Sequence, residues 1–266
     1  MSIAKVNGID MYYERHGSGY PLLMIMGITA RGSVWEDHLV YWSQFFECII
    51  VDNRGVGLSS VPDGEYTSLE MAQDYAALLD ELNIDRCHVI GCSMGSIIGQ
   101  QLAIHFPDKV NKLILMCPWA YCDQRTKSIF EVMVHCKTHF NPAEFSHFIQ
   151  TLIYSNETWA KPGKVDEFTA DQQDALTDDL PQSLQGLKGQ AAACIHHSVL
   201  EDLAHIPHPT LIIGGKDDAF IPAWMAEEMA TTIPNADIHL YPKSGHAFHW
   251  ENIEDFNPRV AEWLNR

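Results

Sequence analysis

The sequence predicts an α/β fold: a mostly parallel sheet flanked by helices, with an inserted helical segment. Three observations support this class. Short runs that are apolar on both faces recur along the chain, as expected for strands buried inside a parallel sheet. Most of these runs alternate with stretches whose apolar residues follow helical spacing. The 266 residues, 46% of them hydrophobic, suffice for one large α/β domain or for a domain with an insertion.

Seven short segments are expected to form strands, and they are residues 10–15, 21–26, 47–52, 87–92, 112–117, 209–214 and 237–241. Helical patterns are clearest at 68–82, 93–105 and 224–232, and in the C-terminal stretch that contains Phe256, Val260, Trp263 and Leu264. Alternation of this kind predicts parallel strands with helices on both faces of the sheet.

The interval 119–205 interrupts the alternation, because it contains no convincing strand. Two apolar series follow helical spacing within it: Ile129, Met133, Cys136 and Phe140, and then Phe145, Phe148, Ile149 and Leu152. We therefore expect residues 1–118 and 206–266 to form the core and residues 119–205 to form a helical cap, or lid. Most of these apolar residues are expected to fill a core, while a few face inward and line a cavity.

The composition argues against several kinds of partner. A formal net charge of -18, with 35 acidic against 17 basic residues, repels phosphate backbones and anionic lipid surfaces, so neither nucleic acid nor membrane is expected as a partner. No run approaches the roughly 20 apolar residues of a membrane span, and the first residues lack a signal-peptide pattern, which predicts a cytoplasmic protein.

No metal site and no cofactor are predicted. The seven cysteines are odd in number and lack CxxC spacing, which indicates neither a disulfide framework nor a zinc site. His196 and His197 lie together but have no companion ligand at metal spacing. Reduced thiols in a cytosol fit this pattern best, and Cys92 is expected to be a small buried filler.

The stretch GCSMG at 91–95 places a serine between two glycines, where a strand-like run meets a helix-like one. The bare motif is weak, since it would arise by chance in roughly one chain in ten of this length. Its position is more informative. A sharp strand-to-helix turn strains its central residue and crowds the positions two before and two after, which gives Gly91 and Gly95 a steric reason. Ser93 is therefore the candidate nucleophile.

A serine hydroxyl needs a neighbouring base, and that base needs an orienting carboxylate. Of the fourteen histidines, His246 lies in a glycine-flanked loop directly after a late strand, and His249 is its competitor. The strand 209–214 is followed by Asp217 and Asp218, at the sheet edge where catalytic groups gather. Ser93, Asp218 and His246 follow the order nucleophile, acid, base of the α/β-hydrolases.

These motifs make essentially the whole chain resemble the α/β-hydrolase superfamily, of the enol-lactonase, carboxylesterase and aminoacrylate-hydrolase type. The matching segments are MG at 26–27, DNRGVGLS at 52–59, GCSMG at 91–95, GGKDDAFIP at 214–222 and GHAFHWE at 245–251. The resemblance selects Asp218 as the acid, four residues before the proline, and His246 as the base, five before a glutamate. Asp123 remains a minor alternative acid. We interpret DNRGVGLS as a structural turn.

The resemblance also implies an oxyanion hole formed by the backbone N–H groups of Ile28 and Met94. The Met94 amide opens the helix 93–105, whose dipole adds positive potential where a tetrahedral intermediate gains charge. Many relatives carry a histidine at the position of Met26, but backbone donation does not depend on it. Four apolar residues near the catalytic positions are expected to line the substrate pocket: Met26, Trp119, Phe220 and Phe248.

The expected function is that of a cofactor-free serine hydrolase. It would cleave a carboxylic ester or lactone of a small to medium apolar substrate through an acyl-enzyme. Two alternatives stay open: an amide, enamine or carbon–carbon bond hydrolase on the same triad, and a slow-turnover ligand receptor. A small-molecule ester or lactone is the expected partner. The sequence does not decide the oligomeric state and leaves a homodimer open.

Overall fold

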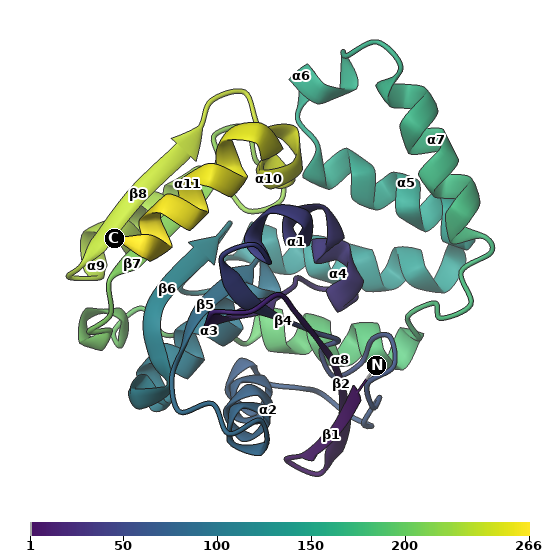
Figure 1. The fold of residues 1–266 in the computed structure, drawn as a ribbon. Coiled ribbons are helices and arrows are strands. Elements are labelled where there is room, and N and C mark those ends of the chain that lie inside the picture. The colour runs from purple at the N-terminus through teal and green to yellow at the C-terminus, as the bar shows by residue number, and fades with distance from the viewer. Residues whose placement is uncertain (1) are drawn as a thin grey trace.

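The computed structural model describes residues 2–266, which form one eight-stranded sheet in the order β1-β2-β4-β3-β5-β6-β7-β8 (Figure 1). Strand β2 runs antiparallel to both of its neighbours, and all pairs from β4 to β8 are parallel. The strands are β1 Ser2–Val6, β2 Ile9–His16, β3 Tyr20–Ile25, β4 Phe46–Val51, β5 Cys87–Cys92, β6 Val110–Met116, β7 Thr210–Gly215 and β8 Ala236–Tyr241. The predicted fold class is confirmed.

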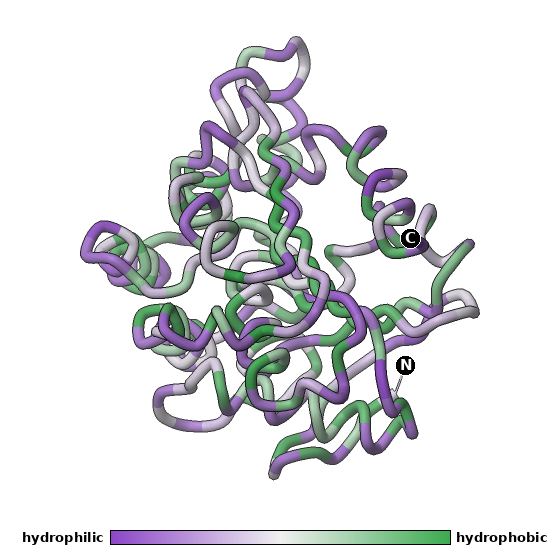
Figure 2. The backbone as a smooth tube through the Cα atoms, turned by 90° about the vertical axis from the view of Figure 1, so that its left-hand side faces the viewer, coloured by the Kyte–Doolittle hydropathy of each residue, from purple (hydrophilic) through white to green (hydrophobic). Residues whose placement is uncertain are grey.

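Side chains of the central strands alternate between two cores, one on each face of the sheet. In β3, Leu23 and Ile25 join the core under α2 Ser68–Glu81, α3 Met94–His105 and α9 Ala223–Thr232. Leu22 and Met24 join the core under α1 Glu36–Trp42 and α11 Ile253–Asn265. Apolar stretches run through the middle of the chain trace, and hydrophilic stretches predominate on the outer loops and helices (Figure 2). Burial on both faces explains why these strands are continuously apolar.

All seven expected strands and the four expected helices are present, with bounds that differ by one to three residues. Two elements of the N-terminal part were not expected. Strand β1 lies at the edge of the sheet and is half exposed, so its short sequence has little apolar content. Helix α1 spans only two turns. The four-residue helix α10 Phe248–Glu251 directly precedes α11.

Between β6 and β7 the chain forms five helices: α4 Gln124–His139, α5 Pro142–Ile153, α6 Asn156–Trp159, α7 Lys164–Ala175 and α8 Leu184–Ile195. Helices α5, α6 and α7 extend beyond the edge of the sheet in Figure 1. Within the described residues, the β structure of this interval is limited to one bridge, between Tyr121 and Ser198. The interval is thus helical as expected, and its role as a lid stays a prediction.

Among residues 2–266, no helix has both the length and the apolar character that crossing a membrane requires.

Candidate active site

Ser93 lies at the junction of β5 and α3, with φ 54° and ψ -118°. A positive φ is costly for a residue with a side chain, so the surrounding structure must hold this conformation. The packing explains the two flanking glycines. A Cβ atom on Gly91 would collide with the carbonyl of Gly95, and one on Gly95 would collide with the carbonyl of Ile25. The backbone therefore presses together at this turn, as the sequence motif predicts.

The Ser93 side chain is 3% exposed, and its Oγ has no hydrogen-bond partner among residues 2–266. A buried hydroxyl without a partner is unusual and is typical of reactive sites. Ser93 and His246 both line one cavity. The loop after β3 passes close by, because a Cβ atom on Gly27 would lie 3.2 Å from the Cβ of Ser93. This loop carries Ile28, whose N–H is one of the two predicted oxyanion donors; the other belongs to Met94, the first residue of α3.

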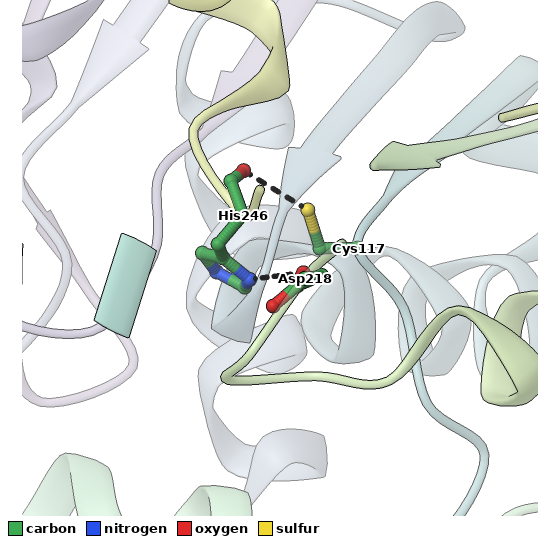
Figure 3. A group of neighbouring side chains, drawn as sticks. All are labelled: Cys117, Asp218 and His246. Atoms are coloured by element: carbon green, nitrogen blue, oxygen red, sulfur yellow. Dashed lines mark hydrogen bonds and ion pairs between the residues drawn. The ribbon is translucent and has the colours of Figure 1, made fainter. Parts of the chain in front are cut away.

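Asp218 and His246 are joined by a hydrogen bond of 2.7 Å, in which Nδ1 of the imidazole donates to Oδ2 of the carboxylate (Figure 3). The other carboxylate oxygen, Oδ1, accepts from the backbone N–H groups of Phe220 and Ile221, both at 2.8 Å. These three bonds fix the orientation of the carboxylate. Because Nδ1 carries the proton, Nε2 of a neutral His246 is free to accept one.

The pKa of His246 is raised by its surroundings. Burial alone would lower this pKa, but the charge of Asp218 and the hydrogen bond to it outweigh the burial. Paired with a carboxylate, the imidazolium form is therefore more stable than it would be in an apolar site without a partner. An imidazole of this kind can take a proton from a neighbouring hydroxyl and return it to a leaving group.

The alternative acids and the alternative base lie elsewhere. Asp217 is exposed at the surface, next to the buried Asp218. Asp123 caps helix α4, where its side chain accepts from the N–H of Thr126 at 2.7 Å. His249 bonds through Nδ1 to Nε2 of His38 at 2.9 Å, and burial lowers its pKa well below the usual range. Of the candidates, the structure brings together Asp218 and His246.

Glu251 was used in the sequence only as a marker for the histidine, and the structure gives it a function. Its carboxylate accepts from the N–H of Gly245 at 2.7 Å and from the N–H of Ser155 at 2.8 Å. The N–H of Ala247 also donates to the carbonyl of Ile153 at 2.8 Å. The loop that carries His246 is thus tied to the end of α5. The fixed spacing between the histidine and the glutamate was the available signal for this role.

Cys117 lies beside Asp218 and His246, and its thiol donates to the backbone carbonyl of His246 at 3.2 Å (Figure 3). Burial raises the pKa of this thiol well above its usual range, which keeps the proton for that bond. The three side chains are close enough to suggest a metal site. However, donor atoms around a tetrahedral zinc lie roughly 3.3 Å apart, and Nδ1 and Oδ2 are only 2.7 Å apart. The group fits a hydrogen-bonded network better than a metal centre.

The cavity at Ser93 measures about 100 Å³. Its lining is almost entirely apolar and comprises Met26, Gly27, Ile28, Thr29, Ala30, Cys92, Ser93, Met133, Ile149, Ile153, Phe220 and His246. Met26 and Phe220 thus lie where the sequence predicted. Helix α4 contributes Met133, and helix α5 contributes Ile149 and Ile153. These three wall residues were not identified as pocket residues, since the helical spacing alone does not say which side of a helix faces a cavity.

The prediction that Trp119 and Phe248 line the pocket is wrong for the cavity that the described residues enclose. Trp119 is fully buried and packs against Phe130, with ring centroids 5.9 Å apart. Phe248 is fully buried and stacks on Tyr241 at 5.6 Å. Both residues adjoin the site in sequence, but their side chains point into the two cores. Proximity along the chain does not determine the direction of a side chain.

The segment DNRGVGLS forms a structural turn, in agreement with its interpretation. The Asp52 carboxylate accepts from the N–H of Gly32 at 2.7 Å and from the N–H of Leu58 at 2.9 Å. Arg54 is buried and forms a two-pronged ion pair with Asp74, at 2.6 and 2.7 Å. Both charged groups are therefore used by the fold itself.

Comparison with known proteins agrees with this geometry. The sequence profile of the alpha/beta hydrolase fold family matches residues 20–253. A protein of Serratia proteamaculans named as a carbamate hydrolase, RutD, is 29% identical, and the match covers 96% of each chain. A thermophilic esterase from Thermogutta terrifontis is 25% identical with a TM-score of 0.86, over 100% of this chain and 98% of the other. The enol-lactonase of Burkholderia xenovorans, at 20% identity, shares the fold with a TM-score of 0.88 over the whole of both chains.

The chain belongs to the α/β-hydrolase family, and it is a hydrolase of that fold.

Proposed function

We propose that this protein is a serine hydrolase that cleaves carboxylic esters with a short, uncharged acyl group. One observation carries the proposal. Ser93, in a strained turn with an unpartnered hydroxyl, borders the same apolar cavity as His246, whose Nδ1 is bonded to the fixed carboxylate of Asp218. Nucleophile, base and orienting acid are the three groups that acyl transfer by a serine requires.

In the proposed reaction, Nε2 of His246 takes the proton of the Ser93 hydroxyl as Oγ attacks the ester carbonyl. The negative oxygen of the tetrahedral intermediate accepts hydrogen bonds from the N–H groups of Ile28 and Met94. The intermediate collapses, the C–O bond to the alcohol breaks, and His246 gives the alcohol its proton. Water then repeats the sequence on the acyl-enzyme and releases the acid. Asp218 stabilises the imidazolium at each stage.

The size and lining of the cavity support a short acyl group. At about 100 Å³ it is smaller than the ~150 Å³ apolar cavity that accepts benzene in another protein. An acyl chain of about four carbons would fill it, and each buried methylene contributes about 0.8 kcal/mol. Beyond that length the walls from α4 and α5 obstruct the chain.

The charge of the lining supports an uncharged substrate. Among the described residues, no lysine or arginine lines the cavity. Arg31, the nearest in sequence, pairs with Asp178 at 3.2 Å. A substrate with a carboxylate on its acyl part would lose its hydration without gaining a partner, which is unfavourable. Dicarboxylic lactones should therefore be poor substrates.

The relative named as a carbamate hydrolase keeps nitrogen-containing acyl substrates open, together with enamines, carbon–carbon bonds and slow ligand binding by a receptor. A panel of p-nitrophenyl esters from acetate to dodecanoate, with lactones, amides and a carbamate, separates these functions. We expect many turnovers, with kcat/KM highest near butyrate and very low at dodecanoate. Faster hydrolysis of the amide or carbamate, or acylation without turnover, would contradict the ester proposal.

A further inference from the structure

The loop that follows β3 is held from two sides. On the core side, the carbonyl of Met26 accepts from Nδ2 of Asn53 at 3.0 Å, and Oδ1 of Asn53 accepts from the hydroxyl of Tyr75 at 2.8 Å. At the other end of the loop, Thr29 has φ 71°. A β-branched residue in the left-handed region is strained, so an external contact must stabilise it.

Gln190 of helix α8 provides that contact. Its side chain is fully buried, and Oε1 accepts from the N–H of Thr29 at 3.0 Å and from Nε2 of Gln182 at 2.8 Å. Nε2 of Gln190 donates to the carbonyl of Arg54 at 2.8 Å. Arg54 is itself fixed by Asp74. The amide of Gln190 is therefore anchored on one side and bonds to the strained loop on the other.

The bond to Thr29 constrains the peptide that links Ile28 to Thr29. Without it, Thr29 can relax to a negative φ, and the peptide would rotate. That rotation would change the backbone angles of Ile28 and the direction of its N–H. The loop has little tolerance for such a change, since it packs against the Cβ of Ser93 at Gly27.

We propose that Gln190 is a positioning residue: it holds the loop 26–29 so that the N–H of Ile28 points to the developing oxyanion. This inference rests on the proposed function, which assigns the oxyanion role to Ile28. It adds a role for helix α8 in the chemistry, beyond any role of the inserted helices in substrate choice. Gln190 itself does not line the cavity formed by the described residues.

The test compares Gln190→Met with Gln100→Met. Gln100 is a matched control, because it is equally buried, donates through Nε2 to the carbonyl of Trp119 at 3.1 Å and faces His197 with its Oε1 at 3.3 Å. Both substitutions remove a buried amide of similar volume, but only Gln190 contacts Thr29. Two readouts are used: kcat and KM on p-nitrophenyl butyrate, and the hydrogen-exchange rate of the Thr29 amide.

We expect Gln190→Met to lower kcat roughly tenfold with little change in KM, since oxyanion donors act mainly in the transition state. Exchange of the Thr29 amide should accelerate about tenfold or more, because its hydrogen bond is lost. Gln100→Met should leave both values near those of the wild type. If Gln190→Met does not fold, the half-buried Gln182→Met should show the same changes at smaller size.

Equal kcat and equal Thr29 exchange in the two methionine variants would overturn the inference. A wild-type protein that hydrolyses no ester would instead contradict the proposed function. In that case the exchange rate of Thr29 still decides whether Gln190 fixes the loop.

Discussion

The strand-end loops and the helices α4 and α5 meet at one cavity, but they build their parts of it differently. At the loops the backbone determines the geometry: Gly91 and Gly95 admit no side chain, and Ser93 is held in a strained conformation. The wall from α4 and α5 consists of apolar side chains, among them Met133 and Ile153. Backbone packing cannot be varied without disrupting the fold, whereas these side chains can be replaced. The comparison assigns the chemistry to the loops and the choice of substrate to the helices.

The largest effect should follow from removing the nucleophile. Ser93→Ala should lower kcat on the order of a millionfold, as serines of catalytic triads do. A fluorophosphonate probe should label the wild-type protein and leave the alanine variant unlabelled. Labelling that persists in Ser93→Ala would remove the chemistry from this turn and break the comparison at its first half.

The next effect should separate two adjacent aspartates. Asp218→Asn should lower kcat up to roughly ten-thousandfold, because His246 would adopt the wrong tautomer and its positive charge would lose its support. Asp217→Asn is the matched control, since Asp217 is the exposed neighbour, and it should change kcat little. The reverse ranking would transfer the orienting role to Asp217.

A smaller and substrate-dependent effect is expected at the helical wall. Ile153→Ala enlarges the cavity and keeps the carbonyl that accepts from Ala247. Room for two more methylenes, at about 0.8 kcal/mol each, should raise kcat/KM for octanoate relative to butyrate roughly tenfold. Leu152→Ala, on the same helix but outside the cavity lining of the described residues, should leave the ratio unchanged. An equal change in both variants would show that α5 does not set the chain length.

The smallest effect is a shift of the pH profile. His246 acts as a base only when neutral, and its pKa is raised, so kcat/KM should fall as the pH drops through a value above the ordinary 6.5. In Asp218→Asn the charge that raises the pKa is gone and burial acts alone, so the limb of the residual activity should move to lower pH. An unchanged limb would mean that another group controls the profile.

The sequence was sufficient for the strands and for the groups at their ends, because both leave local patterns. Continuous apolar runs indicate buried strands, and the glycines around Ser93 report a steric constraint that involves the neighbouring backbone. The resemblance to a family supplied the choice of Asp218 and His246, which the residues alone left open.

The cavity wall could not be predicted in the same way. Met133 and Ile149 were recognised as parts of helices, but the side that faces the cavity depends on how α4 and α5 pack. Trp119 and Phe248 were misassigned because they adjoin the site in sequence while their side chains enter the cores. The contact between Gln190 and Thr29 joins residues 161 positions apart, and no local pattern announces it.

The most direct test of the account is mass spectrometry of the protein quenched during turnover of p-nitrophenyl butyrate. The account predicts a butyryl group on the peptide that contains Ser93, present in the wild type and absent in Ser93→Ala. Asp218→Asn should accumulate it more slowly. Cys92 lines the same cavity and lies beside the serine, so fragmentation must locate the group on one of the two residues. A butyryl group on Cys92, or full turnover with an unmodified Ser93, would contradict the account.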